Sequence, residues 1–102
     1  MTIKEIQFEP HQVGGFKSKT NIKDNIDISI VCGQFFYCSP RANLSHPLEY
    51  DSYEIAIFRD GEFTREFYDE FHGDDVVGYI SEDEIISLIN KIKKSWYQNS
   101  KI

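Results

Sequence analysis

The sequence lacks the features that mark several large classes of protein. No stretch approaches the ~20 consecutive apolar residues that a membrane-spanning helix needs. The opening MTIKEIQFEP has neither the basic end nor the apolar run of a signal peptide, so we expect a cytoplasmic protein. There is no G-x-S-x-G elbow, H-E-x-x-H motif or P-loop. We therefore expect a protein that is not an enzyme and that carries no cofactor.

Cysteine is scarce, with only Cys32 and Cys38 in 102 residues. The C-x5-C spacing is not a usual zinc spacing, and no second pair exists to complete four ligands. In the cytoplasm both thiols stay reduced. We expect buried structural cysteines and no metal site, with a redox or metal role as the alternative.

Positive charge is nearly absent from the middle of the chain. Residues 49–90 hold thirteen of the seventeen carboxylates but only Arg59 and Arg65, a balance of −11. Residues 1–48 sum to +1 and residues 91–102 to +4. A dense field of one sign attracts a basic partner and repels nucleic acid and anionic membrane. The composition therefore excludes direct binding to nucleic acid or to a membrane as the expected function.

Aromatic residues are plentiful, at 15% of the chain, and 102 residues suffice for one core. We expect a single domain over residues 1–102. Its predicted strands cover residues 4–9, 26–32, 35–38, 53–68 as a hairpin, and 76–80. Residues 10–25 read as a loop, 39–52 as a long connection that is often functional or mobile, and 69–75 as an acidic turn.

The hairpin around Asp60 and Gly61 permits two registers. A two-residue turn pairs Phe58 with Phe63. A type I turn with Gly61 in the left-handed region pairs Ile57 with Phe63, and it is the preferred prediction because it mixes apolar and polar faces less.

A C-terminal helix has the clearest signals, and we expect it over about residues 82–96, with a flexible tail over about 98–102. Ser81 and Glu84 have the spacing of a capping box. The apolar stripe comprises Ile85, Leu88, Ile89, Ile92 and Trp96. The stripe needs a partner, which the hairpin face can supply. The predicted fold is α+β, with an antiparallel sheet of about five strands packed against one C-terminal helix in two layers.

The acidic segment supplies the candidate site. Some carboxylates are explained by helix polarity or by the exposed turn, and those that remain favour an anionic patch because few lysines compensate them. The candidate partner-binding residues are Glu49, Tyr50, Asp51, Glu54, Glu66, Asp69, Glu70, Asp74 and Asp75. Ordinary solvation is the alternative, and a cation site over residues 69–75 is another, although the spacing does not match an EF-hand.

Five tyrosines are candidate interface anchors, because tyrosine is enriched at binding hot spots. They are Tyr37, Tyr50, Tyr53, Tyr68 and Tyr79. Tyr50 is selected because it lies in the long connection between Glu49 and Asp51. Packing in the core or the sheet is the alternative for each.

Three segments carry a resemblance: YCSPR (37–41), YEIAIFRDGEF (53–63) and DDVVGYISEDEIISLINKI (74–92). They resemble small acidic proteins encoded by phages and other mobile elements, a class that includes anti-CRISPR and related anti-defence inhibitors. The resemblance covers roughly a third of the chain, is one of general style, and carries over no functional residue. It implies a DNA-mimicking inhibitor that would act in the host cytoplasm.

The leading hypothesis is therefore a non-catalytic inhibitor whose anionic surface occupies a basic, nucleic-acid-binding site on a partner protein. The partner would be a nucleic-acid-binding protein or a nuclease. The alternatives are an immunity protein for a basic toxin nuclease and a small accessory domain that forms a homodimer.

Overall fold

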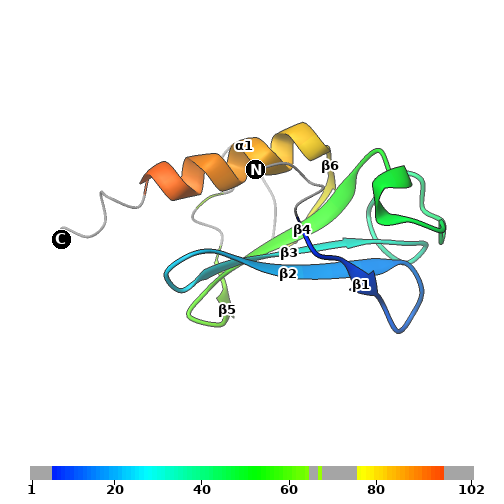
Figure 1. Cartoon of the computed structure of the whole chain (residues 1–102), viewed down its shortest axis with the longest axis horizontal. Helices are drawn as coiled ribbons and strands as arrows, with labels where there is room; N and C mark the ends of the chain where they lie inside the picture. Colours follow the sequence, from blue (N-terminus) through cyan, green and yellow to red (C-terminus); the bar gives the residue numbers. More distant parts are fainter. Residues whose placement is uncertain (1–5, 65–66, 68–75, 96–102) are drawn as a thin grey trace.

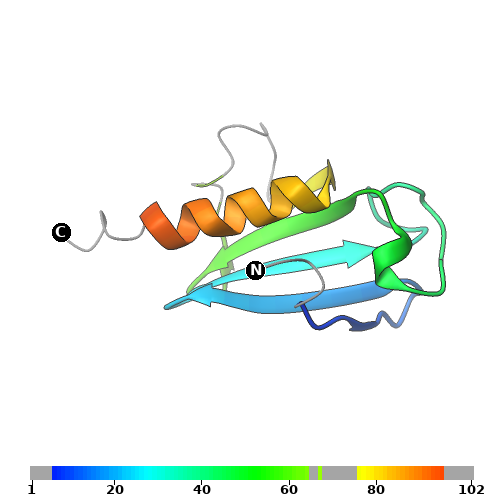
Figure 2. The same cartoon turned by 45° about the horizontal axis from the view of Figure 1, so that its top comes forward.

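The computed structural model describes residues 6–64, 67 and 76–95, and its elements follow the chain in a simple order. The strands are β1 (Glu9–Pro10), β2 (Phe16–Lys23), β3 (Ile26–Cys32), β4 (Tyr53–Arg59), β5 (Glu62–Phe63) and β6 (Val76–Ile80). A 3-10 turn, η2 (Pro47–Glu49), lies in the long connection, and the helix α1 (Glu82–Ser95) follows β6. One helix lies on one face of one antiparallel sheet (Figures 1 and 2), which confirms the predicted α+β class.

β4 is the central strand of the sheet. Strands β1 to β4 lie side by side in chain order, and β4 then pairs with two further strands along its other edge. Its first half pairs with β6, from Tyr53 opposite Ile80 to Ala56 opposite Val76. Its second half pairs with β5. The start of β4 therefore lies beside the start of α1, and its far end lies at the hairpin.

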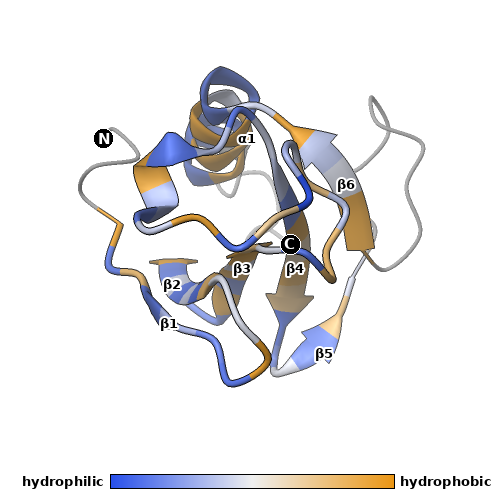
Figure 3. Ribbon diagram, turned by 90° about the vertical axis from the view of Figure 1, so that its right-hand side faces the viewer, coloured by the Kyte–Doolittle hydropathy of each residue, from blue (hydrophilic) through white to orange (hydrophobic). Residues whose placement is uncertain are grey.

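The core lies between α1 and the inner face of β3 and β4. Alternate residues of β3 are buried, as predicted: Ile26, Ile28, Ile30 and Cys32. The helix contributes Ile85, Leu88, Ile89 and Ile92, all buried, whereas Trp96 lies outside the described residues. Hydrophobic colouring on β3, β4 and α1 marks the same core in Figure 3. Burying each such side chain stabilises the fold by about 1.5–3 kcal/mol.

The start of α1 has the predicted capping box. The Ser81 backbone N–H donates to the Glu84 carboxylate at 2.8 Å, and the Glu84 N–H donates to the Ser81 hydroxyl at 3.2 Å. At the other end, the Lys23 ammonium donates to the carbonyl of Lys93 at 2.6 Å. A cation at the helix C-terminus complements the helix dipole and ties β2 to α1.

The loop prediction for residues 10–25 is wrong, because Phe16–Lys23 forms the strand β2. Its inner face carries Ser18 and Thr20, which lie opposite Ile30 and Ile28, and their two hydroxyls hydrogen bond at 3.1 Å. A strand is usually predicted from apolar residues at alternate positions. In β2 two of these inward-facing positions hold polar residues, so the sequence did not indicate a strand. The hydroxyls bond to each other, which lowers the cost of placing them there.

Two other predicted strands are shorter or missing. Of the predicted strand over residues 4–9, only Glu9 lies in a strand, and residues 4 and 5 are outside the described part. Residues 35–38 form no strand, because the Phe36 N–H bonds back to the Gly33 carbonyl and closes a turn. The acidic turn 69–75 and the tail 98–102 also lie outside the described residues.

The preferred hairpin register is wrong. Phe58 pairs with Phe63 and Arg59 with Glu62, so Asp60 and Gly61 form a two-residue turn. Both turn residues have positive φ, 58° and 82°, as a type I′ turn requires. The backbone twist of a type I′ turn matches the twist of the two strands. This match outweighs the cleaner separation of apolar and polar faces that the other register would give. Phe58 and Phe63 consequently pack against each other on the outer face, with tilted rings whose centroids are 4.7 Å apart.

Candidate functional site

The long connection 39–52 is closed at its base by backbone contacts. Ser39 and Ser52 form an isolated β-bridge, and the Asp51 N–H donates to the Ser39 carbonyl at 2.7 Å. Inside the loop the Glu49 carboxylate accepts from the Ser45 hydroxyl and from the Ser45 and His46 backbone N–H groups, at 3.1–3.2 Å. The connection is therefore a folded platform in which Glu49 has a structural role.

Tyr50 holds this platform from inside. It is buried, its hydroxyl donates to the Ala42 carbonyl at 2.6 Å, and it accepts from the Leu44 N–H at 2.9 Å. Burial raises the pKa of its phenol. The prediction that Tyr50 presents its ring to a partner is therefore at odds with the structure, which uses the ring in the core.

The pairing of β4 with β6 brings two distant carboxylates together. Tyr53 lies opposite Ile80, so Asp51, two residues before, and Glu82, two residues after, leave the sheet at the same edge. Both carboxylates act on Tyr53: burial, with smaller contributions from Cys32, Glu82 and Asp51, raises the pKa of its phenol to about 12. Sequence reasoning had assigned Glu82 to helix polarity alone and so missed it as a site residue.

Carboxylates gather at this end of the sheet, which we call the loop end and define as residues 39–54 and 79–84. Six of the eight described acids of the acidic segment belong to it: Glu49, Asp51, Glu54, Glu82, Asp83 and Glu84. The other two, Asp60 and Glu62, lie at the hairpin, about 20 Å away along the seven residues of β4. The remaining candidates, Glu66, Asp69, Glu70, Asp74 and Asp75, lie outside the described residues.

Two exposed tyrosines stand beside these carboxylates. Tyr37 is 52% exposed and Tyr79 is 55% exposed, and their ring centroids are 6.2 Å apart. Tyr79 lies in a bulge of β6, where its φ is 57° and its N–H donates to the Tyr37 carbonyl at 2.9 Å. A bulge re-aims side chains, and a left-handed tyrosine costs on the order of 1 kcal/mol.

The neighbouring residue explains how the pair fits. A Cβ on Gly78 would lie 2.4 Å from the Cβ of Tyr37, so only glycine lets Tyr37 pack there. The Glu54 carboxylate accepts from the Tyr37 N–H at 2.9 Å, and the Arg41 guanidinium lies over the Tyr37 ring at 5.2 Å. A glycine within a predicted strand was the one sequence signal that could have selected Tyr37 and Tyr79 in place of Tyr50.

The outer face of β2 has the opposite charge. Lys17 and Lys19 line a shallow cleft of about 280 Å³ together with His11, Glu9, Ser29 and Val31. The Lys19 ammonium also lies 4.5 Å from the centroid of the Phe58 ring. Among the described residues, the loop end carries six of the eleven carboxylates, whereas Asp24, Asp27, Asp60 and Glu62 lie around the opposite end of β4.

The chemistry of the cysteines is that of core residues. Cys32 and Cys38 are both buried and free. Burial, followed by the neighbouring Cys38, raises the pKa of the Cys32 thiol to about 12. The raised pKa keeps Cys32 in the neutral thiol form at neutral pH, whereas the thiolate is the reactive form.

Two features are absent from the described residues. Residues 6–64, 67 and 76–95 contain no group of three or more His, Cys, Asp or Glu side chains placed to hold a metal ion. Within the same ranges, no helix combines the length and the apolar character required to cross a bilayer.

Comparison with known proteins found no matching protein-family model, no matching curated protein and no matching solved structure.

Proposed function

We propose that this protein is a non-catalytic inhibitor that binds a basic protein through the loop end and occupies a nucleic-acid-binding site on it. The observation that carries the proposal is the register of β4 with β6, which places Asp51 and Glu82 at the same end of the sheet, near the exposed pair Tyr37 and Tyr79. The partner is a nucleic-acid-binding protein or a nuclease, and the function is of the anti-defence type found in phage-encoded inhibitors.

The tyrosines supply the apolar part of such an interface. Tyrosine and arginine dominate binding hot spots, and Tyr37 already carries Arg41 over its ring. Two rings held by backbone contacts lose little conformational freedom when a partner covers them.

The carboxylates supply the specificity. A groove that binds nucleic acid is lined by lysine and arginine. Carboxylates spaced along one edge can meet those cations in place of phosphates, and long-range attraction raises the association rate. That contribution falls as salt screens the charges.

The test compares two charge-neutralised variants that differ only in position. Asp51→Asn with Glu82→Gln alters the loop end, and Asp60→Asn with Glu62→Gln removes the same charge at the hairpin. The partner is first captured from host lysate on the full-length protein, identified and purified. Affinity for each variant is then measured, and so is competition by a 20-base-pair DNA duplex.

We expect the loop-end variant to bind at least 10-fold more weakly, the hairpin variant to bind within 2-fold of the parent protein, and the duplex to displace the protein. Equal affinity of the two variants, or binding that the duplex and 0.5 M salt leave unchanged, would overturn the proposal.

A further inference from the structure

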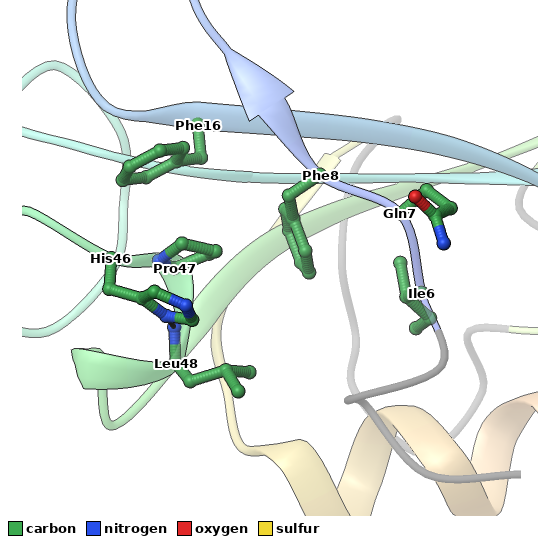
Figure 4. Close-up of a pocket in the computed structure, with 7 residues that line it drawn as sticks. All are labelled: Ile6, Gln7, Phe8, Phe16, His46, Pro47 and Leu48. Atoms are coloured by element: carbon green, nitrogen blue, oxygen red, sulfur yellow. Dashed lines mark hydrogen bonds between the residues drawn. The ribbon is translucent and has the colours of Figure 1, made fainter.

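A preformed pocket lies at the loop end, next to the carboxylates. It has a volume of about 300 Å³ and opens between the N-terminal segment and η2 (Figure 4). Its lining consists of Ile6, Gln7, Phe8, Phe16, His46, Pro47 and Leu48. Most of these side chains are apolar or aromatic, which is the usual lining of a site for a small molecule or a side chain.

Core contacts hold both walls of the pocket. Phe8 packs on Tyr53 with ring centroids 6.2 Å apart, and the Tyr53 hydroxyl donates to the Pro47 carbonyl at 2.9 Å. One buried tyrosine therefore joins the N-terminal wall to η2. The His46 Nδ1 accepts from the Leu48 N–H at 3.1 Å, which fixes the imidazole as the cap of η2. The pocket does not need to form when a ligand arrives.

Two carboxylates flank the lining along the chain. Glu49 follows Leu48, and Asp51 comes two residues later; both are exposed. Glu9 lines the cleft on the outer face of β2 instead. We call Glu49 and Asp51 the rim of the pocket, and their negative charge favours a ligand that carries positive charge beside the group in the pocket.

We infer that the pocket receives one aromatic side chain that is flanked by lysine or arginine on the basic partner. This inference rests on the proposed function and names the partner's anchor. An aromatic ring fits because Phe8, Phe16, His46 and Pro47 present flat surfaces, against which a ring gains about 0.5–1.5 kcal/mol beyond its buried area. The flanking cations then meet the carboxylates of the rim.

The first test uses short peptides as probes of the full-length protein. Acetyl-Lys-Trp-Lys-amide, acetyl-Lys-Leu-Lys-amide, acetyl-Lys-Ala-Lys-amide and acetyl-Glu-Trp-Glu-amide are titrated, and methyl NMR shifts of Ile6 and Leu48 are followed. We expect the Lys-Trp-Lys peptide to shift both methyl groups and to bind at least 5-fold more tightly than each of the others. Equal binding of the Lys-Ala-Lys peptide, or tighter binding of the Lys-Leu-Lys peptide, would overturn the assignment of an aromatic anchor.

A matched pair of variants places the site. Leu48 is 38% exposed at the pocket, and Val13 is 46% exposed outside its lining, so Leu48→Arg and Val13→Arg make the same change in charge at two exposed positions. Leu48→Arg should weaken Lys-Trp-Lys binding at least 5-fold, whereas Val13→Arg should leave it within 2-fold. Equal loss in both variants would assign the binding to general charge and overturn the inference.

The outcomes separate this inference from the proposed function. If the peptide shifts Ile6 and Leu48 but the loop-end variant binds the captured partner normally, the pocket stands and the proposed inhibitor function fails. If the peptide fails and the loop-end variant loses the partner, the pocket inference alone is overturned.

Discussion

At the scale of single residues, the tyrosines fall into two groups that differ in burial and in the partners of their hydroxyls. Tyr50 and Tyr53 are buried, and each hydroxyl bonds to a backbone group of the loop over residues 39–52. Tyr37 and Tyr79 are exposed on the edge of β6. Residue type and neighbouring charges cannot make this distinction, because a loop tyrosine is equally able to turn inwards or outwards. The inward choice depends on backbone groups, such as Ala42, that fold back around the ring.

The Tyr50→Phe variant tests the role assigned to the buried hydroxyl. It leaves the Leu44 N–H and the Ala42 carbonyl without their partner, so we expect the free energy of unfolding to fall by about 1–3 kcal/mol. Urea denaturation measures it. Tyr37→Phe is the control, because it removes an exposed hydroxyl and should change stability by less than about 0.5 kcal/mol. Equal effects of the two changes would contradict the structural role of Tyr50.

At the scale of elements, the strands and the helix that can be predicted are those in which local sequence signals agree with the pattern of buried residues. The alternation in β3 and the capping box with its apolar stripe in α1 were sufficient to place both. β2 was missed because Ser18 and Thr20 occupy its inner face. The hairpin was assigned the wrong register because the face pattern was weighed above the turn, where Asp60 and Gly61 both adopt positive φ.

The capping box gives an element-scale prediction. Ser81→Ala removes the oxygen that accepts from the Glu84 N–H, and it should lower the free energy of unfolding by about 0.5–2 kcal/mol. Ser87→Ala makes the same chemical change at an exposed position inside α1, where alanine is the better helix former, and it should be neutral or slightly stabilising. Thermal unfolding followed by circular dichroism compares them. A loss at Ser87 as large as that at Ser81 would show that the cap is not the cause.

At the scale of the whole molecule, most of the described carboxylates of the acidic segment lie at one end of the fold. The sequence indicated the acidic segment, but it could not show that Glu82 and Asp51 lie at the same end of the sheet, because that depends on the register of β4 with β6. It also could not show that Lys17 and Lys19 share a cleft on the outer face. The charge of a stretch of sequence can be counted directly. Where those charges lie in the folded protein depends on the order and register of the strands.

Stability should fall at alkaline pH through two buried groups. The pKa is raised to about 12 for both Cys32, from 9.0, and Tyr53, from 10.0. Below about pH 8 both groups are neutral in the folded and the unfolded chain, so their contribution is fully present there. Between about pH 9 and 12 only the unfolded chain ionises them, and stability declines.

Urea midpoints measured from pH 7 to 11 test this expectation. We expect a flat profile to about pH 8.5 and a falling one above pH 9. Cys32→Ala should lower the midpoint at all pH values because of the cavity it leaves, and it should also make the fall between pH 9 and 10 shallower. An unchanged slope in that variant would show that Cys32 does not cause the decline.

The turn at Asp60 and Gly61 has a practical consequence. Gly61 has a φ of 82°, which strains any side chain placed there, whereas Glu62 beside it is exposed, and the turn lies at the opposite end of β4 from Asp51 and Glu82. A dye or affinity handle joined to the chain at this turn would point away from the surface assigned to the partner. The hairpin is therefore the position from which the protein can be immobilised or imaged while its partner is bound.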